Sequence, residues 1–453
     1  MNLHSKLRQR EAEGRPVRVG LIGAGKFGSM FLAQVLHTPG MHLLGVADLA
    51  VERARASLAR TGWPEERYRA GSFADALQTG QTFVTDDSEA MIAADGLDVV
   101  VEATGNPAAG IHHALACIEH GRHVVMVNVE ADVLAGPLLA EKARSAGIVY
   151  SMAYGDQPAL ICELVDWARA CGYEVVCAGK GMNFEPHFRY STPATVWDYF
   201  GFTEEQVRAG DLNPQMFNSF VDGTKAAIEM AAVANGTGLT CMPQGLDFPP
   251  CGLHDLAQIL KPRSEGGRLA HGGTVEIAAS QEPDGREVFN NIRFGVFVTF
   301  KAPDQYSREC FAQYGLNTDR SGWYASLWRP FHLIGMETGI SVGWAALRGE
   351  ATGSPYGWQG DVAAAAKRDL EPGEVLDGEG GHLLWGRLVR ASDSSAAGML
   401  PIGLAHGIRL RNRVAKDQPV RWADVEIDES REAVRVRRAM ERRFAEQAVA
   451  ETL

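Results

Sequence analysis

Residues 17–28 of the chain read Val-Arg-Val-Gly-Leu-Ile-Gly-Ala-Gly-Lys-Phe-Gly, an apolar run that passes directly into a G-x-G-x-x-G turn. The apolar, β-branched start of this stretch predicts a buried strand. A helical pattern follows and stops at Thr38-Pro39-Gly40, and a second apolar run, residues 43–47, ends on Asp48. This order of strand, glycine turn, helix, strand and acidic residue predicts a Rossmann unit that binds a dinucleotide.

Each part of this unit has a physical role in binding the cofactor. Gly23 permits the tight turn, Gly25 lets the pyrophosphate approach the backbone, and Gly28 allows the helix to pack closely on the strand. Free N–H groups and the dipole at the helix N-terminus attract the phosphates. Asp48 can accept hydrogen bonds from the ribose hydroxyls and would repel a 2′-phosphate, so the sequence favours NAD over NADP.

The bulk composition excludes several classes of protein. The chain has 453 residues, enough for roughly two to four domains, and is 45% hydrophobic and 22% charged, as expected of a soluble globular protein. A net charge of −12 without a basic block argues against nucleic acid or an anionic membrane as the main partner. No apolar stretch is long enough to span a membrane, and residues 1–15 lack the hydrophobic region of a secretory signal. The seven cysteines form no C-x-x-C pair, so we expect reduced thiols in a cytoplasmic protein.

Strands and helices alternate along the first third of the chain, which predicts an α/β fold with a doubly wound parallel sheet. We expect a Rossmann dinucleotide-binding domain (1–155), an α+β substrate or catalytic domain (156–361), a small β-rich module (362–427) and a C-terminal helix (428–453). Residues 185–213 are rich in proline, aromatic and charged residues and are predicted to form an irregular excursion over the mouth of the active site.

In such a sheet, ligands bind beyond the carboxyl ends of the strands. The polar and glycine residues that follow the predicted strands should therefore share one rim, with the nicotinamide near the later members. The expected cofactor-binding residues are Gly23, Gly25, Lys26, Phe27, Gly28, Asp48, Thr104, Gly105, Asn128 and Glu130.

Moving a hydride to or from a carbinol carbon requires a group that takes or gives the hydroxyl proton. Lys180, placed just after a predicted strand at 174–178, and Lys225, placed near the start of a predicted helix, are the candidates. Asp156, Asp222 and Glu229 could orient such a lysine. The spacing of Lys225 and Glu229 puts them on one helix face, although an ordinary surface ion pair has the same spacing.

Further residues are candidates for binding substrate or metal. Asn183, Arg329 and His332 are expected to contact the substrate, since arginine binds a carboxylate or phosphate through two hydrogen bonds. The alternative for Arg329 and His332 is a structural ion pair. Asp156 and Glu163, together with Glu130, could hold Mg²⁺ or Mn²⁺, whereas the alternative for Asp156 is the N-cap of a helix.

One more group has the spacing of metal ligands. His113, Cys117 and His120 share a helix face, but no fourth ligand is apparent, and a helix packed on the sheet explains them better than zinc does.

Several longer motifs carry a resemblance to a known family. They are Asn128-Val129-Glu130-Ala131-Asp132, Gly155-Asp156-Gln157-Pro158, Ala178-Gly179-Lys180-Gly181, Asp222-Gly223-Thr224-Lys225, Glu229-Met230-Ala231, Arg329-Pro330-Phe331-His332-Leu333, Lys367-Arg368-Asp369-Leu370-Glu371-Pro372-Gly373 and Leu400-Pro401-Ile402-Gly403. Through them the chain resembles the homoserine-dehydrogenase-like oxidoreductases with a C-terminal SAF domain, over most of residues 15–427. Within that group it is similar to the deoxyxylulose phosphate reductoisomerase-like enzymes, which reduce and rearrange a sugar phosphate.

Two departures from these families shape the functional expectation. The reductoisomerase-like enzymes favour NADPH, whereas Asp48 favours NAD; homoserine dehydrogenases keep an Asn-Lys pair where this chain has Asn128-Val129. The resemblance therefore implies an NAD-dependent dehydrogenase or oxidoisomerase, in a homo-oligomer, acting on a small polyhydroxylated anionic substrate such as a sugar acid or sugar phosphate. The alternatives are a homoserine dehydrogenase and a non-catalytic NAD-binding sensor whose C-terminal module contacts a partner.

Overall fold

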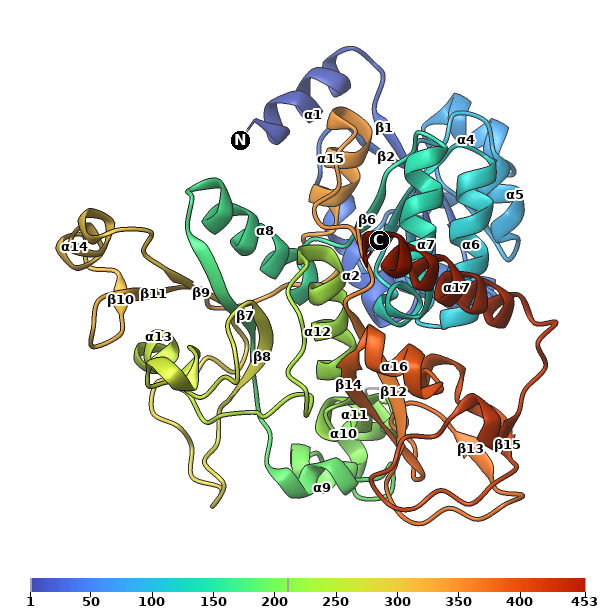
Figure 1. Cartoon of the computed structure of the whole chain (residues 1–453). Helices are drawn as coiled ribbons and strands as arrows, with labels where there is room; N and C mark the ends of the chain where they lie inside the picture. The colour runs from blue at the N-terminus through green and yellow to red at the C-terminus, as the bar shows by residue number, and fades with distance from the viewer. Residues whose placement is uncertain (1, 210–211, 453) are drawn as a thin grey trace. The chain divides into compact units, whose positions relative to one another are not determined.

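The chain forms two compact units in the computed structural model, which describes residues 2–209 and 212–452 (Figure 1). The first unit comprises Met1–Leu160 and His332–Tyr356, and the second comprises Ile161–Phe331 and Gly357–Leu453. The structure does not describe residues 1, 210–211 and 453. These residues belong to three of the regions expected from the sequence.

The first unit contains a six-stranded sheet in the order β3-β2-β1-β4-β5-β6, in which every neighbouring pair is parallel. The strands are β1 (Val17–Ile22), β2 (Met41–Ala47), β3 (Phe83–Thr85), β4 (Val99–Glu102), β5 (His123–Met126) and β6 (Tyr150–Met152). The order reverses between β1 and β4, so the ends of these two strands form the switch point where dinucleotides bind. The predicted doubly wound Rossmann sheet is confirmed.

Helices connect these strands and cover the sheet. They are α1 (Leu3–Ala12), α2 (Lys26–Val35), α3 (Val51–Arg60), α4 (Phe73–Thr79), α5 (Ser88–Ala93), α6 (Pro107–Glu119), α7 (Val129–Ser145) and α15 (Gly339–Arg348), with the 3₁₀ turn η1 (Glu65–Tyr68). The helix α8 (Gln157–Ala170) contains the boundary between the two units.

The helix α15 and its flanks come from much later in the chain than the sheet they cover. The N–H of Met152 in β6 donates to the carbonyl of Gly353, and the N–H of Tyr154 donates to Ser341 Oγ at 2.8 Å. Val342 of α15 is fully buried in the same apolar core as β1 and β4. The segment 332–356, expected in the substrate domain, therefore belongs to the Rossmann unit.

The helix α7 starts at Val129, where the Oδ1 of Asn128 accepts the N–H of Ala131 at 3.0 Å and caps its first turn. Pro137 lies inside this helix.

The second unit contains a five-stranded, mostly antiparallel sheet in the order β10-β11-β9-β7-β8. Its strands are β7 (Glu174–Met182), β8 (Thr274–Ala279), β9 (Val296–Lys301), β10 (Asn317–Thr318) and β11 (Tyr324–Arg329). Strand β7 pairs parallel with β8 and antiparallel with β9, so it lies in the interior of the sheet. It extends four residues beyond the predicted strand at 174–178, which places Lys180 inside a strand rather than after one.

The remaining helices and 3₁₀ turns of this unit lie between or after the strands of this sheet along the chain. The helices are α9 (Val196–Phe200), α10 (Glu204–Ala209), α11 (Pro214–Val221), α12 (Thr224–Thr237), α13 (Leu256–Ile259), α14 (Gln305–Gln313), α16 (Ala391–Ala397) and α17 (Glu432–Thr452), with 3₁₀ turns η2 (Pro186–Tyr190), η3 (Leu253–Asp255), η4 (Arg263–Glu265), η5 (Ile402–Leu404) and η6 (Trp422–Asp424). The region 185–213 is thus partly helical, although it was predicted to be irregular.

The expected β-rich module is present but is packed on helix α12. Its strands are β12 (Gly360–Ala366), β13 (Val375–Asp377), β14 (Leu384–Arg390), β15 (His406–Leu410) and β16 (Val425–Glu426). A Cβ on Gly386 would lie 2.7 Å from Thr224 Cγ2, so β14 approaches α12 too closely for any other residue. The module therefore shares a core with the catalytic region.

The C-terminal helix α17 is anchored by a buried ion pair. The guanidinium of Arg437 is fully buried and donates to both carboxylate oxygens of Asp361, at 3.0 and 2.6 Å. Val434 and Met440 on the same helix are also fully buried. A buried arginine requires such a counter-charge, and Asp361 on β12 supplies it. None of the described helices is long and apolar enough to cross a membrane.

We predict that Asp132→Asn changes how stability depends on pH. Burial raises the pKa of Asp132 to about 7, opposed by the hydrogen bond from Tyr150 Oη at 2.9 Å. The folded state therefore holds this proton more tightly than the unfolded state, so stability falls as pH rises from about 4 through 7 and then levels off. Asp132→Asn lacks this pH-dependent term. The difference between the midpoints of thermal unfolding, variant minus wild type, should therefore increase between about pH 5 and pH 8.

A matched control keeps the buried carboxyl group. Tyr150→Phe removes a hydrogen bond that lowers the pKa of Asp132, so this variant should retain a pH dependence at least as strong as that of the wild type. Parallel pH profiles for the wild type and Asp132→Asn would contradict the assignment.

Candidate active site

The glycine turn has the geometry that dinucleotide binding requires. Gly23 has a φ of 92°, and a Cβ there would lie 2.7 Å from the carbonyl oxygen of Ala103 at the end of β4. A Cβ on Gly28 would lie 2.1 Å from the carbonyl oxygen of Gly23, so α2 packs directly on the turn. A Cβ on Gly25 would meet no atom within 4 Å, which leaves open space where a pyrophosphate approaches.

The N-terminus of α2 adds hydrogen-bond donors to this space. Gly25 is the N-cap residue and has no side chain to bond the N–H groups of the first turn. Those N–H groups are left for a ligand, and the helix dipole favours an anionic one. Lys26 and Phe27 form the start of this turn, with Lys26 exposed. The cradle fits the pyrophosphate of a dinucleotide.

Asp48 lies beside the glycine turn, and its carboxylate is held in place. Its Oδ2 accepts the N–H of Ala24 at 2.8 Å, and its Oδ1 accepts the N–H of Ala50 at 2.9 Å and the guanidinium of Arg53 at 2.6 Å. The next residue, Leu49, is 93% exposed. An exposed leucine next to a directed carboxylate suits an adenosine, whose ribose is polar and whose base is flat and apolar.

The ends of β4 and β5 are joined by a polar network. Thr104 Oγ1 donates to Glu102 Oε1 at 2.5 Å, and Asn128 Nδ2 donates to the carbonyl of Asn106 at 2.8 Å and to Thr104 Oγ1 at 3.3 Å. Gly105 has a φ of 69°, so the chain turns sharply there. The predicted rim residues Thr104, Gly105 and Asn128 therefore come together, and Glu130 lies in the first turn of α7.

Glu102 is a residue of this rim that the sequence analysis did not select. It is fully buried, and its Oε1 also contacts His113 Nδ1 at 3.2 Å, while Ser88 Oγ contacts His113 Nε2 at 3.1 Å. The sequence signal that could have identified Glu102 is an acidic residue at the end of an apolar strand. The contacts also explain His113 as a buried helix residue bonded at both ring nitrogens.

In the second unit, Lys180 and Glu229 form a buried ion pair. Lys180 Nζ donates to Glu229 Oε2, and both residues are less than 10% exposed. Lys180 comes from the middle of the sheet and Glu229 from α12, so the pair joins two elements. The sequence had placed Glu229 on a helix face with Lys225, but the carboxylate meets Lys180.

The glycines beside Lys180 explain why the lysine points toward α12. Side chains alternate along a strand, so Gly179 and Gly181 face away from the side that carries Lys180. A Cβ on Gly181 would lie 2.0 Å from the carbonyl oxygen of Ile292, and a Cβ on Gly179 would meet Phe297 at 3.2 Å. Backbone and aromatic groups fill one face of the strand there, and the lysine takes the other.

Asp222 pairs with a lysine other than the two candidates. Its Oδ2 is 2.8 Å from Lys367 Nζ, and both side chains are buried. Lys367 Nζ also donates to the carbonyls of Ser191 and Gly381, each at 2.7 Å. This pair joins the end of α11 to the β-rich module, so its geometry is that of a structural contact. Lys225 lies partly buried in the first turn of α12.

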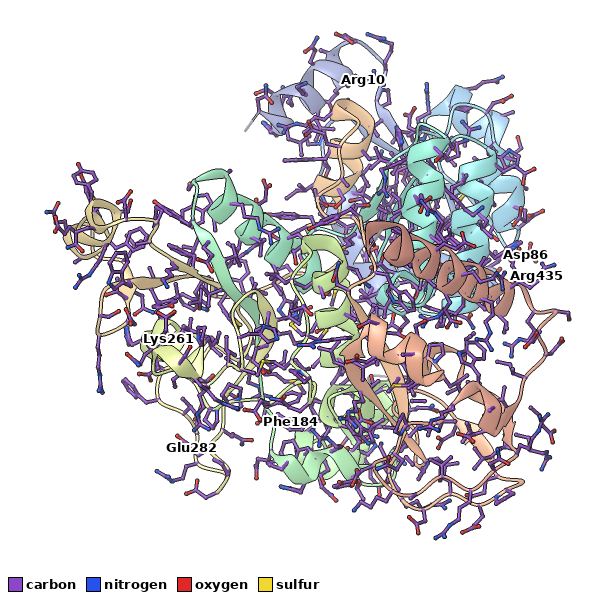
Figure 2. All side chains as sticks on the ribbon, in the orientation of Figure 1. Arg10, Asp86, Phe184, Lys261, Glu282 and Arg435 are labelled. Atoms are coloured by element: carbon purple, nitrogen blue, oxygen red, sulfur yellow. The ribbon has the colours of Figure 1, made fainter. Side chains whose placement is uncertain are left out.

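A second buried lysine pair in the same unit provides a comparison. Lys261, which follows α13, donates to Asp319 Oδ2 at 2.6 Å (Figure 2). Ser321 and the N–H of Tyr324 also bond Asp319, so that carboxylate is fully engaged by a loop. Lys261 was not selected from the sequence, and its surroundings indicate a structural role.

The expected substrate-binding residues are divided between the units. In the first unit, Gln157 Nε2 contacts His332 Nε2 at 2.9 Å, next to Asp156 at the start of α8. In the second unit, the Oδ1 of Asn183 is buried and has no hydrogen-bond partner within the described residues, as a ligand-binding amide would. Arg329 ends β11, with its guanidinium 5.2 Å from the ring of Phe331.

The expected metal ligands do not form a cluster. Asp156 is buried, and its Oδ1 accepts the N–H of Gln157 at 2.9 Å, as at a helix start, whereas Glu163 lies exposed on α8. Among residues 2–209 and 212–452, no group of three or more His, Cys, Asp or Glu side chains could hold a metal ion. The expected binding of Mg²⁺ or Mn²⁺ stays a prediction, and no step proposed below uses a metal ion.

Glu276 is another buried acid that the sequence analysis missed. Burial raises its pKa to about 8, while hydrogen bonds from the N–H groups of Ile277, Asp247 and Phe248 act in the opposite direction. These bonds hold the loop 244–248 against β8. The sequence signal that could have identified Glu276 is a single glutamate within an apolar strand.

Two family matches agree with this geometry. Residues 23–151 match the family described as "Homoserine dehydrogenase, NAD binding domain", and residues 155–338 match "Oxidoreductase DRL, catalytic domain". The second range includes both Lys180 and Glu229. The chain thus has an NAD-binding domain followed by an oxidoreductase catalytic domain, the arrangement of an NAD(P)-dependent oxidoreductase. No curated protein sequence matches the chain.

Solved structures give more distant similarities. Myo-inositol dehydrogenase from Lactobacillus casei, in complex with NAD(H) and myo-inositol, is 15% identical, with 40% of this chain and 50% of that chain covered and a TM-score of 0.28. UDP-N-acetylglucosamine 3-dehydrogenase from Acidithiobacillus ferrooxidans is 18% identical, with 38% and 49% covered and a TM-score of 0.26. An NAD binding oxidoreductase from Klebsiella pneumoniae is 16% identical, with 72% and 68% covered and a TM-score of 0.32. The chain spans about half the length of the first two.

We predict that Gly25→Ala and Gly28→Ala separate cofactor binding from stability. The Cβ of Gly25→Ala enters the open cradle, so NADH should bind at least about tenfold more weakly, with less than about 1 kcal/mol change in the free energy of unfolding. Gly28→Ala forces α2 off the turn and should cost about 1–3 kcal/mol. Fluorescence titration and chemical unfolding measure the two effects; undiminished NADH affinity in Gly25→Ala would refute the cradle.

Proposed function

We propose that the chain is an NAD-dependent dehydrogenase or oxidoisomerase that acts on a CH–OH group of a small polyhydroxylated, anionic molecule such as a sugar acid or sugar phosphate. The observation that carries this proposal is the buried Lys180–Glu229 pair within the matched catalytic domain. Bound NAD would accept or supply the hydride. The resemblance to SAF-domain and reductoisomerase-like proteins, the homo-oligomeric state and the cytoplasmic location stay predictions.

Lys180 is the group proposed to act on the substrate oxygen. Its ammonium donates a hydrogen bond to Glu229, which fixes the side chain and leaves two further N–H groups for a ligand. During reduction the Lys180 ammonium gives a proton to the substrate oxygen and becomes a neutral amine. During oxidation that neutral amine takes the hydroxyl proton and becomes the ammonium again. Glu229 positions the lysine and balances its charge in a buried place where an isolated ammonium would be costly. A non-catalytic sensor would not require this arrangement.

An alternative substrate is homoserine, since residues 23–151 match the NAD-binding domain of homoserine dehydrogenase. That match covers the cofactor domain alone, so it does not bear on the substrate. Assays with NAD⁺ and homoserine, alongside a panel of sugar acids and sugar phosphates, distinguish the two substrates, and NAD binding without turnover on any of them would favour the sensor.

The preference for NAD is proposed to rest on Asp48. Its carboxylate is directed by Ala24 at the turn and would repel a 2′-phosphate. Arg53 pairs with the same carboxylate and is 62% exposed, so it is a nearby group that could attract that phosphate. We expect repulsion to dominate because the carboxylate is buried and fixed, whereas the guanidinium is in solvent, where its charge is screened.

We therefore predict opposite effects for two substitutions. Asp48→Ala should reduce the ratio of NADH to NADPH affinity by about tenfold or more. Arg53→Ala should leave that ratio unchanged or raise it, because it removes a positive charge that could attract the 2′-phosphate. Affinity titrations with both coenzymes measure the ratio. An unchanged ratio in Asp48→Ala would show that the carboxylate does not select the coenzyme.

We also predict that Lys180→Met abolishes turnover while Lys261→Met does not. Each variant leaves one buried carboxylate without its lysine and should lose about 3–5 kcal/mol of stability. Only Lys180→Met should lower kcat by about 100-fold or more, with NADH affinity retained. Rates are compared per folded protein, quantified by circular dichroism. Equal kcat losses in the two variants would reduce Lys180 to a structural residue.

A further inference from the structure

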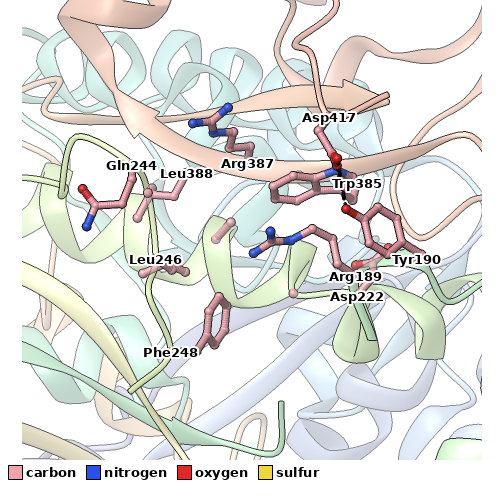
Figure 3. A pocket seen from close by; sticks show the side chains of 14 residues that line it. Arg189, Tyr190, Asp222, Gln244, Leu246, Phe248, Trp385, Arg387, Leu388 and Asp417 are labelled. Atoms are coloured by element: carbon pink, nitrogen blue, oxygen red, sulfur yellow. Dashed lines mark hydrogen bonds between the residues drawn. The ribbon is translucent and has the colours of Figure 1, made fainter. Parts of the chain in front are cut away.

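A cavity of about 310 Å³ lies within the second unit, away from the lysine pair described above (Figure 3). Its walls come from the start of α12, from the loop 244–248 and from β14. The volume suits a small metabolite rather than a single ion, since drug-sized ligand sites begin at about 300 Å³. Neither Lys180 nor Glu229 lines it.

Two arginines, Arg189 and Arg387, line this cavity. In the part of the chain that the structure describes, neither guanidinium has a carboxylate partner or a side-chain hydrogen bond. Arg189 instead stacks on the ring of Trp385, 4.4 Å from its centroid, with Phe184 at 6.0 Å. Burial is the main cause of the lowered pKa of Arg189 and the charge of Arg387 adds to it, whereas Tyr190, Asp417 and Asp222 act in the opposite direction. Two neighbouring like charges without a directly bonded counter-ion are unfavourable, and an anionic ligand between them would supply one.

The two acidic residues of the cavity act on Arg189 only from a distance, because each bonds another group directly. Asp222 is paired with Lys367 at 2.8 Å. Asp417 accepts the hydroxyl of Tyr190 at 2.9 and 3.1 Å. Figure 3 shows Asp417 and Tyr190 at one end of the cavity, while the two guanidinium groups end toward Gln244. The cavity therefore has a cationic end and, opposite it, an end that offers hydrogen-bond acceptors.

We propose that this cavity binds the phosphoryl group of a small phosphorylated molecule between Arg189 and Arg387. A phosphate dianion can neutralise both arginines and accept paired hydrogen bonds from their planar groups. The Trp385 ring holds Arg189 extended, so little side-chain freedom is lost on binding. Hydroxyl groups on the rest of the molecule would face Asp417 and Tyr190.

The cavity also adjoins the candidate catalytic pair through one helix. Asp222 and Gly223, at its wall, precede α12, and Glu229 of that helix bonds Lys180. A bound phosphoryl group would therefore stabilise the helix that positions Lys180. Only the identity of the phosphorylated molecule rests on the proposed function; phosphate binding itself does not.

The test is calorimetric titration of inorganic phosphate into the full chain saturated with NADH, at constant ionic strength. NADH occupies the glycine cradle, which would otherwise bind phosphate as well. Arg387→Gln should weaken phosphate binding at least about tenfold. The matched control Arg411→Gln removes an exposed arginine of the same unit outside the cavity and should bind phosphate as the wild type does.

A second variant and a second anion complete the test. Arg387→Lys keeps the charge but loses the paired hydrogen bonds, so its affinity should be intermediate, and it answers the question if Arg387→Gln does not fold. Acetate, with one charge, should bind at least about tenfold more weakly than phosphate. The proposal is overturned if the wild type does not bind phosphate, if Arg387→Gln binds it unchanged, or if acetate binds equally well.

Steady-state kinetics distinguish the two sources of the phosphoryl group. If it belongs to the substrate, phosphate should compete with substrate, and Arg387→Gln should raise KM by about the factor by which it weakens phosphate. If it belongs to a separate molecule, phosphate should change kcat at saturating substrate, and Arg387→Gln should abolish that change. The effect of Lys180→Met on kcat does not depend on which of these two kinetic outcomes is found. A cavity that does not bind phosphate can therefore be distinguished from a proposed reaction that does not occur.

Discussion

A buried charge must meet an opposite charge, and this requirement organises the second unit around helix α12. Glu229 on that helix meets Lys180 from β7, and Asp222 just before it meets Lys367 from the β-rich module. Asn235, near its end, accepts the N–H groups of Gln359 and Gly360 at 2.8 and 2.9 Å. Because an unpaired partner in any of these contacts would be costly, α12 holds strand β7 and the β-rich module together.

The Rossmann unit could be predicted closely, because its signal is local. The turn at Gly23, Gly25 and Gly28 needs particular backbone conformations and clearances, which only glycine provides, so sequence and geometry correspond residue by residue. Asp48 likewise ends a strand that the sequence shows. The start of α7 is a local feature as well, because the side chain of Asn128 caps it.

The pairing of charges could not be predicted in the same way, because it depends on contacts between distant residues. Lys225 and Glu229 have the spacing of a helical ion pair, yet the sheet delivers Lys180 to that carboxylate. Asp222 was expected to orient a catalytic lysine, but it meets Lys367, 145 positions later in the chain. Neither Arg189 nor Arg387 has a motif around it, so their shared cavity emerges only from the fold.

The discontinuous make-up of the first unit has a consequence for biosynthesis. Strand β6 obtains its outer hydrogen bond from Gly353, and α15 covers core residues of β1 and β4. As the nascent chain leaves the ribosome, the nucleotide-binding sheet therefore stays incomplete until roughly 200 further residues have been translated. Its apolar face is exposed during that interval, when chaperones have their best opportunity to engage it.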